Sequence, residues 1–386
     1  MIPPGKTLGV LGGGQLGAMF AMAAKRMGYR VEAISDVADC PAAHHCDRVH
    51  VGAYDNHEWL MDIARTLDVV TFEFENIPVA AARAIAECVP VYPSPEVLYT
   101  TQDRSREKAF LVQHGFACAP HRVVCSRADL HAAVAAIGLP AILKTAASGY
   151  DGKGQKRIES GSGSQAIDAA WDALGPKELV LEAWIDFDVE ISVVAARSET
   201  GEIAVYEPSL NIHRHHILDT ASAPTNLSPR ILAAARATTA KILTALSVVG
   251  VACVEFFVTP DGQVLVNEIA PRPHNSGHLT IDACETSQFE QQVRTICGLP
   301  LGSPRQLMPA AMVNLLGECW EHGEPNWPLA ICVPGVRLLL YGKSEPRVGR
   351  KMGHLTASAA TVEDALANAL HARQVACHYS PSAETP

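Results

Sequence analysis

The sequence predicts a mixed fold, part α/β and part α+β, with two or three domains. The chain has 386 residues, of which 48% are hydrophobic and 19% charged. Such a composition buries a large core and excludes disordered, collagen-like and coiled-coil chains. A strand, a glycine turn, a helix and a second strand open the chain, as in α/β proteins. After about residue 104, helices alternate with strands and β-hairpins, which indicates an α+β unit. At roughly 100–200 residues per domain, one domain is too few.

Hydrophobic periodicity, proline positions and helix caps locate the individual elements. In the first unit we expect strands over residues 6–11, 29–34 and 69–74, and helices over 15–27 and from Pro78. In the second unit we expect helices over 127–137, from Ser228 and from Ser287, strands over 141–144 and 179–185, and a hairpin over 251–269. In the last unit we expect a strand over 335–341 and a helix over 361–372. The boundaries give domains of residues 1–103, 104–300 and 301–386.

Composition also narrows the class of protein. The 41 acidic and 31 basic residues give a net charge of −10, so we expect no nucleic-acid partner. No apolar run reaches the roughly 20 residues that a membrane span needs, and the N-terminus lacks a signal-peptide pattern. We therefore expect a cytoplasmic protein without a membrane partner. The eleven cysteines include no C-x-x-C pair and predict reduced thiols rather than disulfides or a zinc site.

The turn over residues 12–17, Gly-Gly-Gly-Gln-Leu-Gly, fits the G-x-G-x-x-G fingerprint of dinucleotide-binding folds. Alone, this pattern indicates only that backbone N–H groups and a helix N-terminus face an anion. We expect a phosphate-bearing ligand at the turn, and keep NAD and a purely structural turn as alternatives.

Two glutamates in the hairpin over residues 251–269 form the most informative pattern. With a two-residue turn at Asp261-Gly262, Glu255 and Glu268 lie directly opposite each other, and with a four-residue loop they lie diagonally on one face. Two carboxylates placed in this way repel each other, and a magnesium ion would relieve the repulsion. The alternatives are an exposed glutamate at the hairpin edge and a catalytic acid–base pair.

A glycine-rich loop follows the strand that ends at Lys144. Its sequence over residues 148–155, Ser-Gly-Tyr-Asp-Gly-Lys-Gly-Gln, can close its backbone over phosphates. The pattern G-x-x-x-x-G-K-[ST] is absent from the sequence, which excludes a P-loop NTPase. Glu182 and Glu190 lie in later strands, where a single carboxylate is more often solvated than a ligand.

Two further segments are candidates for substrate contacts. Residues 270–278 contain two prolines and present Arg272 and His274, and an arginine fork suits carboxylate, bicarbonate or phosphate. The alternative is that these side chains bond backbone carbonyls. The basic residues between 343 and 351 are expected to form a phosphate pocket. In His-Arg-His-His over residues 213–216 we expect one nucleotide contact rather than a zinc site, because neighbours on a strand point to opposite faces.

The order of these motifs resembles the ATP-grasp superfamily, in which two α+β subdomains hold ATP between them. Within it, residues 6–356 resemble the N5-carboxyaminoimidazole ribonucleotide synthase family. The resemblance is carried by residues 12–17, 72–76 (Phe-Glu-Phe-Glu-Asn), 149–155, 267–278 and 349–354. It implies an ATP-grasp fold with an N-terminal Rossmann-like domain and a small C-terminal domain. Ala18 departs from the family, which usually has arginine there.

That family uses ATP and bicarbonate to carboxylate 5-aminoimidazole ribonucleotide through carboxyphosphate, in purine biosynthesis. The resemblance implies ATP contacts by Arg104, Lys144, Gly149, Tyr150, Asp151, Gly152, Lys153, Gly154, Gln155, Glu182, Ala183, Trp184, Ile185, Glu190, His213, Asn267 and Glu268. It implies two Mg²⁺ ions held by Glu255 and Glu268. It implies ribonucleotide contacts by Gln15, Glu73, Tyr150, Asp151, Asn275, Ser276, Lys343, Arg350 and Lys351. Arg272 and His274 would hold carboxyphosphate, Asp151 would orient or deprotonate the amine, and the chain would form a homodimer.

Three other functions remain open from the sequence. One is an ATP-grasp ligase for a different amine, similar to the formate-dependent glycinamide ribonucleotide transformylase. Another is an NAD-linked oxidoreductase, which leaves Glu255, Glu268 and the glycine-rich loop without a role. The third is a module that binds nucleotide without turnover.

Overall fold

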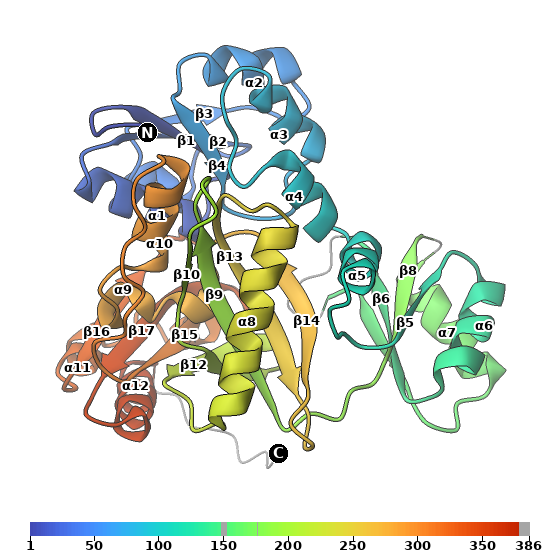
Figure 1. The fold of residues 1–386 in the computed structure, drawn as a ribbon. Helices are drawn as coiled ribbons and strands as arrows, with labels where there is room; N and C mark the ends of the chain where they lie inside the picture. The colour runs from blue at the N-terminus through green and yellow to red at the C-terminus, as the bar shows by residue number, and fades with distance from the viewer. Residues whose placement is uncertain (148–152, 176, 378–386) are drawn as a thin grey trace.

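The computed structural model describes residues 1–147, 153–175 and 177–377. In this part of the chain the strands form three sheets (Figure 1). The predicted Gly149, Tyr150, Asp151 and Gly152 contacts lie outside the described residues.

The first sheet is parallel, with strand order β3-β2-β1-β4. Its unit consists of β1 (Thr7–Leu11), α1 (Gln15–Arg26), β2 (Arg30–Ser35), η1 (Pro41–His44), β3 (Arg48–Val51), α2 (His57–Ala64), β4 (Val69–Phe72), α3 (Val79–Ala86) and α4 (Pro95–Thr101). All five residues of β1 are buried, as expected for a parallel strand with helices on both faces. The predicted Rossmann-like unit is therefore confirmed.

A small lobe follows, which Figure 1 shows standing apart from the rest. It contains α5 (Arg104–Gln113), β5 (His121–Val124), α6 (Arg127–Ile137), β6 (Ala141–Thr145), β7 (Gln155–Ile158), α7 (Ser164–Leu174) and β8 (Leu179–Ala183). The sheet is antiparallel in the order β5-β8-β6-β7. Helix α6 starts where Ser126, its N-cap, accepts the backbone N–H of Asp129 at 3.1 Å, and the helix predicted over residues 127–137 is confirmed.

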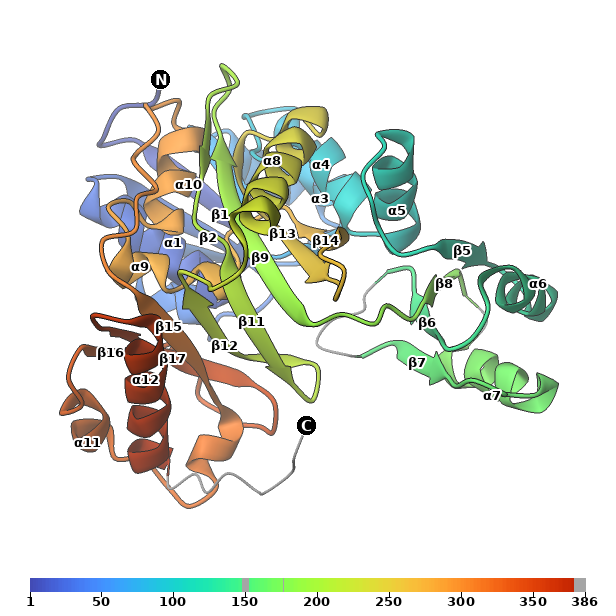
Figure 2. The same cartoon turned by 60° about the horizontal axis from the view of Figure 1, so that its bottom comes forward.

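The largest sheet is antiparallel and joins the middle of the chain to its C-terminal part (Figure 2). Its middle part contains β9 (Val189–Arg197), β10 (Ile203–Val205), β11 (Ser209–Arg214), β12 (Ile217–Ala223), α8 (Pro229–Ala245), β13 (Gly250–Val258), β14 (Val264–Ala270), η2 (Asn275–Gly277), α9 (Thr280–Ala283) and α10 (Gln288–Ile296). Its last part contains β15 (Ala310–Leu316), η3 (Gly317–Trp320), α11 (Trp327–Ile331), β16 (Val336–Leu340), β17 (Lys351–Ser358) and α12 (Val362–Cys377). Strand β15 pairs with β12, so the sheet crosses the boundary expected near residue 300.

The β13–β14 hairpin places Glu255 directly opposite Glu268, which is one of the two predicted arrangements. Both predicted loops, of two and of four residues, are wrong, because Val258 pairs with Val264 across residues 259–263. A register shift between Glu255 and Phe256 then restores the opposition: Phe256 pairs with Val266, and Asn267 is the extra residue of a β-bulge.

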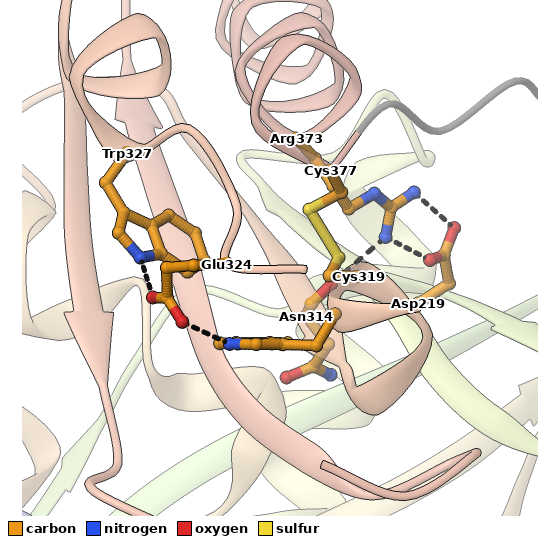
Figure 3. Close-up of a disulfide and its surroundings, with 8 residues drawn as sticks. Asp219, Asn314, Cys319, Glu324, Trp327, Arg373 and Cys377 are labelled. Atoms are coloured by element: carbon orange, nitrogen blue, oxygen red, sulfur yellow. Dashed lines mark hydrogen bonds and ion pairs between the residues drawn. A yellow bond between two sulfur atoms is a disulfide. The ribbon is translucent and has the colours of Figure 1, made fainter. Parts of the chain in front are cut away.

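The expectation that all the cysteines are reduced thiols is wrong for one pair. Cys319 in η3 and Cys377 at the end of α12 form a disulfide, with Cα atoms 4.6 Å apart (Figure 3). The two residues are 58 positions apart, and only the packing of α12 against the sheet brings them together. Spacing along the chain carries no signal of this.

No helix of the described residues is long and apolar enough to cross a membrane.

Candidate active site

A cavity of about 870 Å³ opens where the three parts of the described chain meet. Many of the residues predicted for the site line it: Gln15, Glu73, Arg104, Lys144, Lys153, Gly154, Gln155, Trp184, Glu190, His213, Glu255, Asn267, Glu268, Arg272, His274, Asn275 and Lys351. Six other predicted residues are not part of its lining: Glu182, Ala183, Ile185, Ser276, Lys343 and Arg350. Segments far apart in the sequence thus supply one site.

Glu182 gathers cations at the wall formed by the small lobe. One of its carboxylate oxygens lies 3.0 Å from Lys144 Nζ and 3.9 Å from Lys108 Nζ, and the other lies 3.5 Å from an Arg104 nitrogen. Burial raises the pKa of Glu182, but these cations outweigh it and hold that pKa well below its usual range. The Glu182 carboxylate therefore positions Lys144 and Arg104 at the cavity.

Burial disfavours the charged form of Lys144 and lowers its pKa, while the Glu182 carboxylate opposes this effect. Lys108 is fully buried and donates to the Asn267 carbonyl at 2.9 Å. The bulged residue of the β13–β14 hairpin is thus tied to α5, beside the cations.

Glu255 and Glu268 have different electrostatic surroundings although they face each other. Glu255 is buried, and its Oε1 lies 3.0 Å from His274 Nε2. Burial raises the pKa of Glu255, but the hydrogen bond and charge of His274 dominate and lower it to about 2. The Glu268 side chain is 44% exposed, and its Oε2 lies 3.6 Å from Arg104. Desolvation and the charge of Glu255 raise the pKa of Glu268.

This donor set fits a magnesium ion. Two opposed carboxylates and the neighbouring Asn267 side chain offer a few hard oxygen donors and leave further positions for water and phosphate oxygens, which Mg²⁺ prefers. The pKa of Glu268 is raised by burial and by Glu255 although Arg104 and Lys144 oppose this, so a cation beside the two carboxylates would relieve their repulsion. Among the described residues no group of three or more His, Cys, Asp and Glu side chains could hold a metal ion.

Arg272 is held rigidly at the opposite side of the carboxylate pair. Both of its terminal donors reach Glu75: Nη2 donates to Oε1 at 2.7 Å and Nε donates to Oε2. The carboxylate of Glu75 raises the pKa of Arg272 despite burial. A bidentate pair of this kind fixes the plane of the guanidinium. The third nitrogen, Nη1, donates to the Pro273 carbonyl at 3.2 Å, so part of the expected alternative, a bond to a backbone carbonyl, is present.

The glycine turn surrounds a carboxylate that belongs to the chain itself. Glu73 follows β4 and accepts the backbone N–H of Gly14, and that of Gly17 at 2.8 Å. A Cβ atom at Gly12 would lie 2.4 Å from Glu73, so the close approach requires glycine there. The expected ligand phosphate is therefore replaced at these two N–H groups by Glu73, and the NAD alternative loses its pyrophosphate site.

An apolar part of the cavity lies between the small lobe and the hairpin. Phe187 and Phe257 stack with their ring centroids 4.6 Å apart, and both line the cavity with Ile142 and Trp184. Across from them, His213 Nδ1 lies 2.6 Å from Glu190 Oε2. Of residues 213–216, for which we expected one nucleotide contact, only His213 and Arg214 lie on β11. His215 and His216 lie in the turn between β11 and β12, so the argument from opposite faces of a strand does not apply to them.

The predicted basic residues near 350 are arranged around Lys351. Lys343 Nζ donates to the Lys351 carbonyl at 2.7 Å, and Arg350 donates to the Glu345 carbonyl at 2.7 Å. Ser344, in the same loop, reaches Asp39 of the first unit at 3.4 Å. The loop before β17 thus contacts the N-terminal unit.

Several residues of the site were missed in the sequence. Glu75 lies in the segment 72–76, where the family resemblance implied a role for Glu73 alone. Its partner Arg272 is 197 positions away, so no local sequence pattern indicates the pair. Glu107, Lys108 and Phe187 were missed as well, whereas His278 belongs to the polar segment 270–278 that was expected to hold substrate but was given no specific role. Burial of Glu107 and Lys108 inside α5 is contrary to the usual exposure of charged residues.

Three family models match successive parts of the chain: a ribonucleotide synthetase preATP-grasp domain over residues 5–102, an ATP-grasp domain over 109–289, and a phosphoribosylaminoimidazole carboxylase C-terminal domain over 310–368. The N5-carboxyaminoimidazole ribonucleotide synthase of Brucella melitensis is 45% identical over 92% of this chain and 97% of its own.

Solved structures agree with these matches. An ADP complex of an N5-carboxyaminoimidazole ribonucleotide synthetase has a TM-score of 0.91 and 39% identity, over 96% of this chain and 97% of its own. The Aspergillus clavatus N5-carboxyaminoimidazole synthase, in complex with ADP and 5-aminoimidazole ribonucleotide, has a TM-score of 0.85 and 30% identity, over 96% of this chain and 98% of its own. The chain therefore belongs to the N5-carboxyaminoimidazole ribonucleotide synthase family, within the ATP-grasp enzymes.

Proposed function

We propose that the protein is an ATP-dependent carbon–nitrogen ligase of purine biosynthesis. It carboxylates the exocyclic amine of 5-aminoimidazole ribonucleotide with bicarbonate, and forms N5-carboxyaminoimidazole ribonucleotide, ADP and phosphate. The observation that carries the proposal is the convergence, in one cavity, of the Lys144 and Arg104 cations, the Glu255–Glu268 pair and the Arg272–His274 segment. Cations, opposed carboxylates and a rigid guanidinium are what phosphoryl transfer to bicarbonate requires.

ATP would lie between the small lobe and the β13–β14 hairpin. The adenine base fits the apolar part with Phe187, Phe257 and Trp184, while Lys144 and Arg104 meet the phosphates. The residues at 149–155 would close over the phosphates, and Glu190 and His213 would contact the nucleotide. Mg²⁺, in two ions held by Glu255 and Glu268 with Asn267 nearby, would neutralise charge on the transferring phosphoryl group when bound.

In the first step a bicarbonate oxygen attacks the γ-phosphorus of ATP, the bond to ADP breaks, and carboxyphosphate forms. The protein contributes position and charge rather than a covalent intermediate. Arg272, fixed by Glu75, and His274, beside Glu255, would hold the two negative ends of the intermediate. Burial lowers the pKa of His274, whereas Cys253 and Glu255 raise it, to about 10; its Nδ1 accepts the Ser276 N–H at 3.3 Å.

In the second step the C–O bond of carboxyphosphate breaks to give CO₂ and phosphate. The amine nitrogen then forms a bond to the carbon of CO₂ and loses one proton, which gives the carbamate. Exclusion of water protects both carboxyphosphate and CO₂. Asp151 and Tyr150 would face the amine, and Gln15, Glu73, Asn275, Ser276, Lys343, Arg350 and Lys351 would hold the ribonucleotide.

The family resemblance also supports proposals on assembly. The chain would be a cytoplasmic homodimer, with domains near residues 1–103, 104–300 and 301–386.

The test is ADP release from MgATP and bicarbonate, with and without 5-aminoimidazole ribonucleotide, while the labile carbamate is trapped. ADP that depends on the ribonucleotide and equals the carbamate supports the proposal. Glu268→Gln should nearly abolish ADP formation, whereas Lys351→Ala should mainly raise the apparent KM for the ribonucleotide. Turnover indifferent to the ribonucleotide, or the opposite pattern of the two variants, contradicts it.

A further inference from the structure

His278 is a buried histidine at the cavity to which the mechanism above gives no role. Its side chain is 0% exposed, and it lines the cavity together with Arg272, His274 and Lys351. Within the part of the chain that the structure describes, Nε2 of His278 is buried without a hydrogen-bond partner. A buried polar atom left unpaired destabilises the folded protein. Such an atom in a cavity wall indicates that a bound molecule supplies the missing hydrogen bond.

Gln288 determines which nitrogen of His278 carries the proton. Gln288 Oε1 accepts the backbone N–H of His274 at 2.8 Å, and its Nε2 donates to the His274 carbonyl at 2.8 Å. These two bonds fix the orientation of the amide. The same amide nitrogen lies 3.2 Å from His278 Nδ1, and because an amide nitrogen only donates, Nδ1 accepts. A neutral imidazole then carries its proton on Nε2, which makes Nε2–H a donor.

The surroundings keep this ring neutral and fixed. Burial lowers the pKa of His278 well below its usual range, and the neighbouring His354, His274, Lys351 and Arg272 lower it further. The His354 ring packs against it with centroids 4.8 Å apart, and its own Nδ1 lies 2.9 Å from the Tyr341 hydroxyl. Burial lowers the pKa of His354 to about 3, so the two tilted rings pack together without mutual charge repulsion.

We propose that His278 is a further binding residue of the carboxylation site and donates its Nε2–H to an oxygen of the bicarbonate-derived carboxyl group. The inference rests on the proposed function. Arg272 and Lys351 line the cavity with His278 and bring positive charge to it, which favours an anionic group there over a neutral one. Another buried cation would be costly, whereas a neutral donor adds one directed hydrogen bond without a further charge.

A pair of substitutions separates this role from a structural one. His278→Gln can place an amide N–H near the position of Nε2, whereas His278→Asn can keep an acceptor for Gln288 but ends before Nε2. We expect the asparagine variant to raise the apparent KM for bicarbonate roughly 10- to 100-fold, the factor for one hydrogen bond to a charged group. It should also release ADP in excess of carbamate. The glutamine variant should stay much closer to the parent protein, with KM for ATP unchanged in both.

The His278 variants need a control substitution at another histidine and a check that each variant folds. His114→Asn, at an exposed histidine of the α5 end, should change none of these quantities, and thermal unfolding checks each fold. If the parent protein shows no ribonucleotide-dependent ADP release, the proposed function fails and this inference with it. If the parent is active but both His278 variants behave alike, or only KM for the ribonucleotide rises, the inference alone is overturned.

A second measurement applies if His278→Asn does not fold. Long-range ¹H–¹⁵N spectra of the histidine rings in the intact protein report which nitrogen is protonated. A neutral His278 with a protonated Nε2 that shifts when bicarbonate is added with MgADP supports the proposal. A protonated Nδ1, or an Nε2 signal indifferent to bicarbonate, overturns it.

Discussion

At the scale of single residues, buried charges tie the three parts of the chain to the cavity. Glu107 of α5 accepts the backbone N–H of Ile269 at 2.8 Å and is only 3% exposed. Burial raises the pKa of Glu107 to about 7, although Lys108 and Arg104 oppose this. The folded protein therefore holds a proton on Glu107 more tightly than the unfolded protein does, because the pKa of Glu107 in the unfolded protein is near 4.5.

Because the pKa of Glu107 is higher in the folded protein, its contribution to the unfolding free energy falls as the pH rises. Glu107 contributes its stability below about pH 4.5 and loses that contribution as the pH rises through about 7. Glu107→Gln keeps an oxygen for Ile269 but cannot ionise. We expect the parent, relative to this variant, to lose about 1–3 kcal/mol of unfolding free energy between pH 5 and pH 7.5. Urea unfolding at both pH values measures this loss of unfolding free energy. Glu58→Gln, at an exposed site, is the control and should behave like the parent. Equal losses in the parent and in Glu107→Gln would refute the raised pKa of Glu107.

Residues whose role depends on near neighbours were the ones predictable from the sequence. Glu255 and Glu268 sit in one hairpin, so counting along two strands places them opposite each other, although the turn length was wrong. By contrast, Glu75 and Arg272 form an ion pair across 197 positions of the chain. The bond from Gln288 to His278 depends on how the Gln288 amide is oriented in the folded protein. No local pattern encodes such contacts, because the fold alone brings them together.

At the scale of elements, α12 connects the C-terminal end of the described chain to the cavity. Arg373 pairs with Asp219 of β12 and donates to the Asn314 carbonyl of β15 at 3.1 Å (Figure 3). The Asn314 side chain in turn exchanges hydrogen bonds with Asn275, at 2.7 and 3.1 Å. A buried polar chain therefore runs from α12 to a lining residue of the cavity, which explains why the unit after residue 300 shares the main sheet.

The disulfide at the end of α12 gives a direct chemical prediction. The chain has eleven cysteines, and nine of them are free thiols in the structure. Protein purified without reductant and unfolded in guanidinium should therefore show nine reactive thiols, and eleven after reduction. Eleven thiols before reduction would contradict the Cys319–Cys377 bond.

At the scale of the whole molecule, the parallel sheet, the small lobe and the large antiparallel sheet each provide one wall of a single cavity. The sequence was sufficient for the fold class and for the unit that opens the chain, because short-range periodicity and caps determine these elements. It did not predict β15 and β17, or the pairing of β15 with β12, because that pairing joins strands about 90 residues apart. Strand β17 joins the sheet through β15. The domain boundaries stay a proposal.

The central claim is that a bicarbonate oxygen attacks the γ-phosphorus of ATP in this cavity. The most direct measurement uses ¹⁸O-labelled bicarbonate with MgATP and 5-aminoimidazole ribonucleotide, and follows the label in the phosphate released. The account predicts one ¹⁸O atom transferred to each phosphate, in step with carbamate formation. Phosphate that carries no label while carbamate accumulates would contradict it.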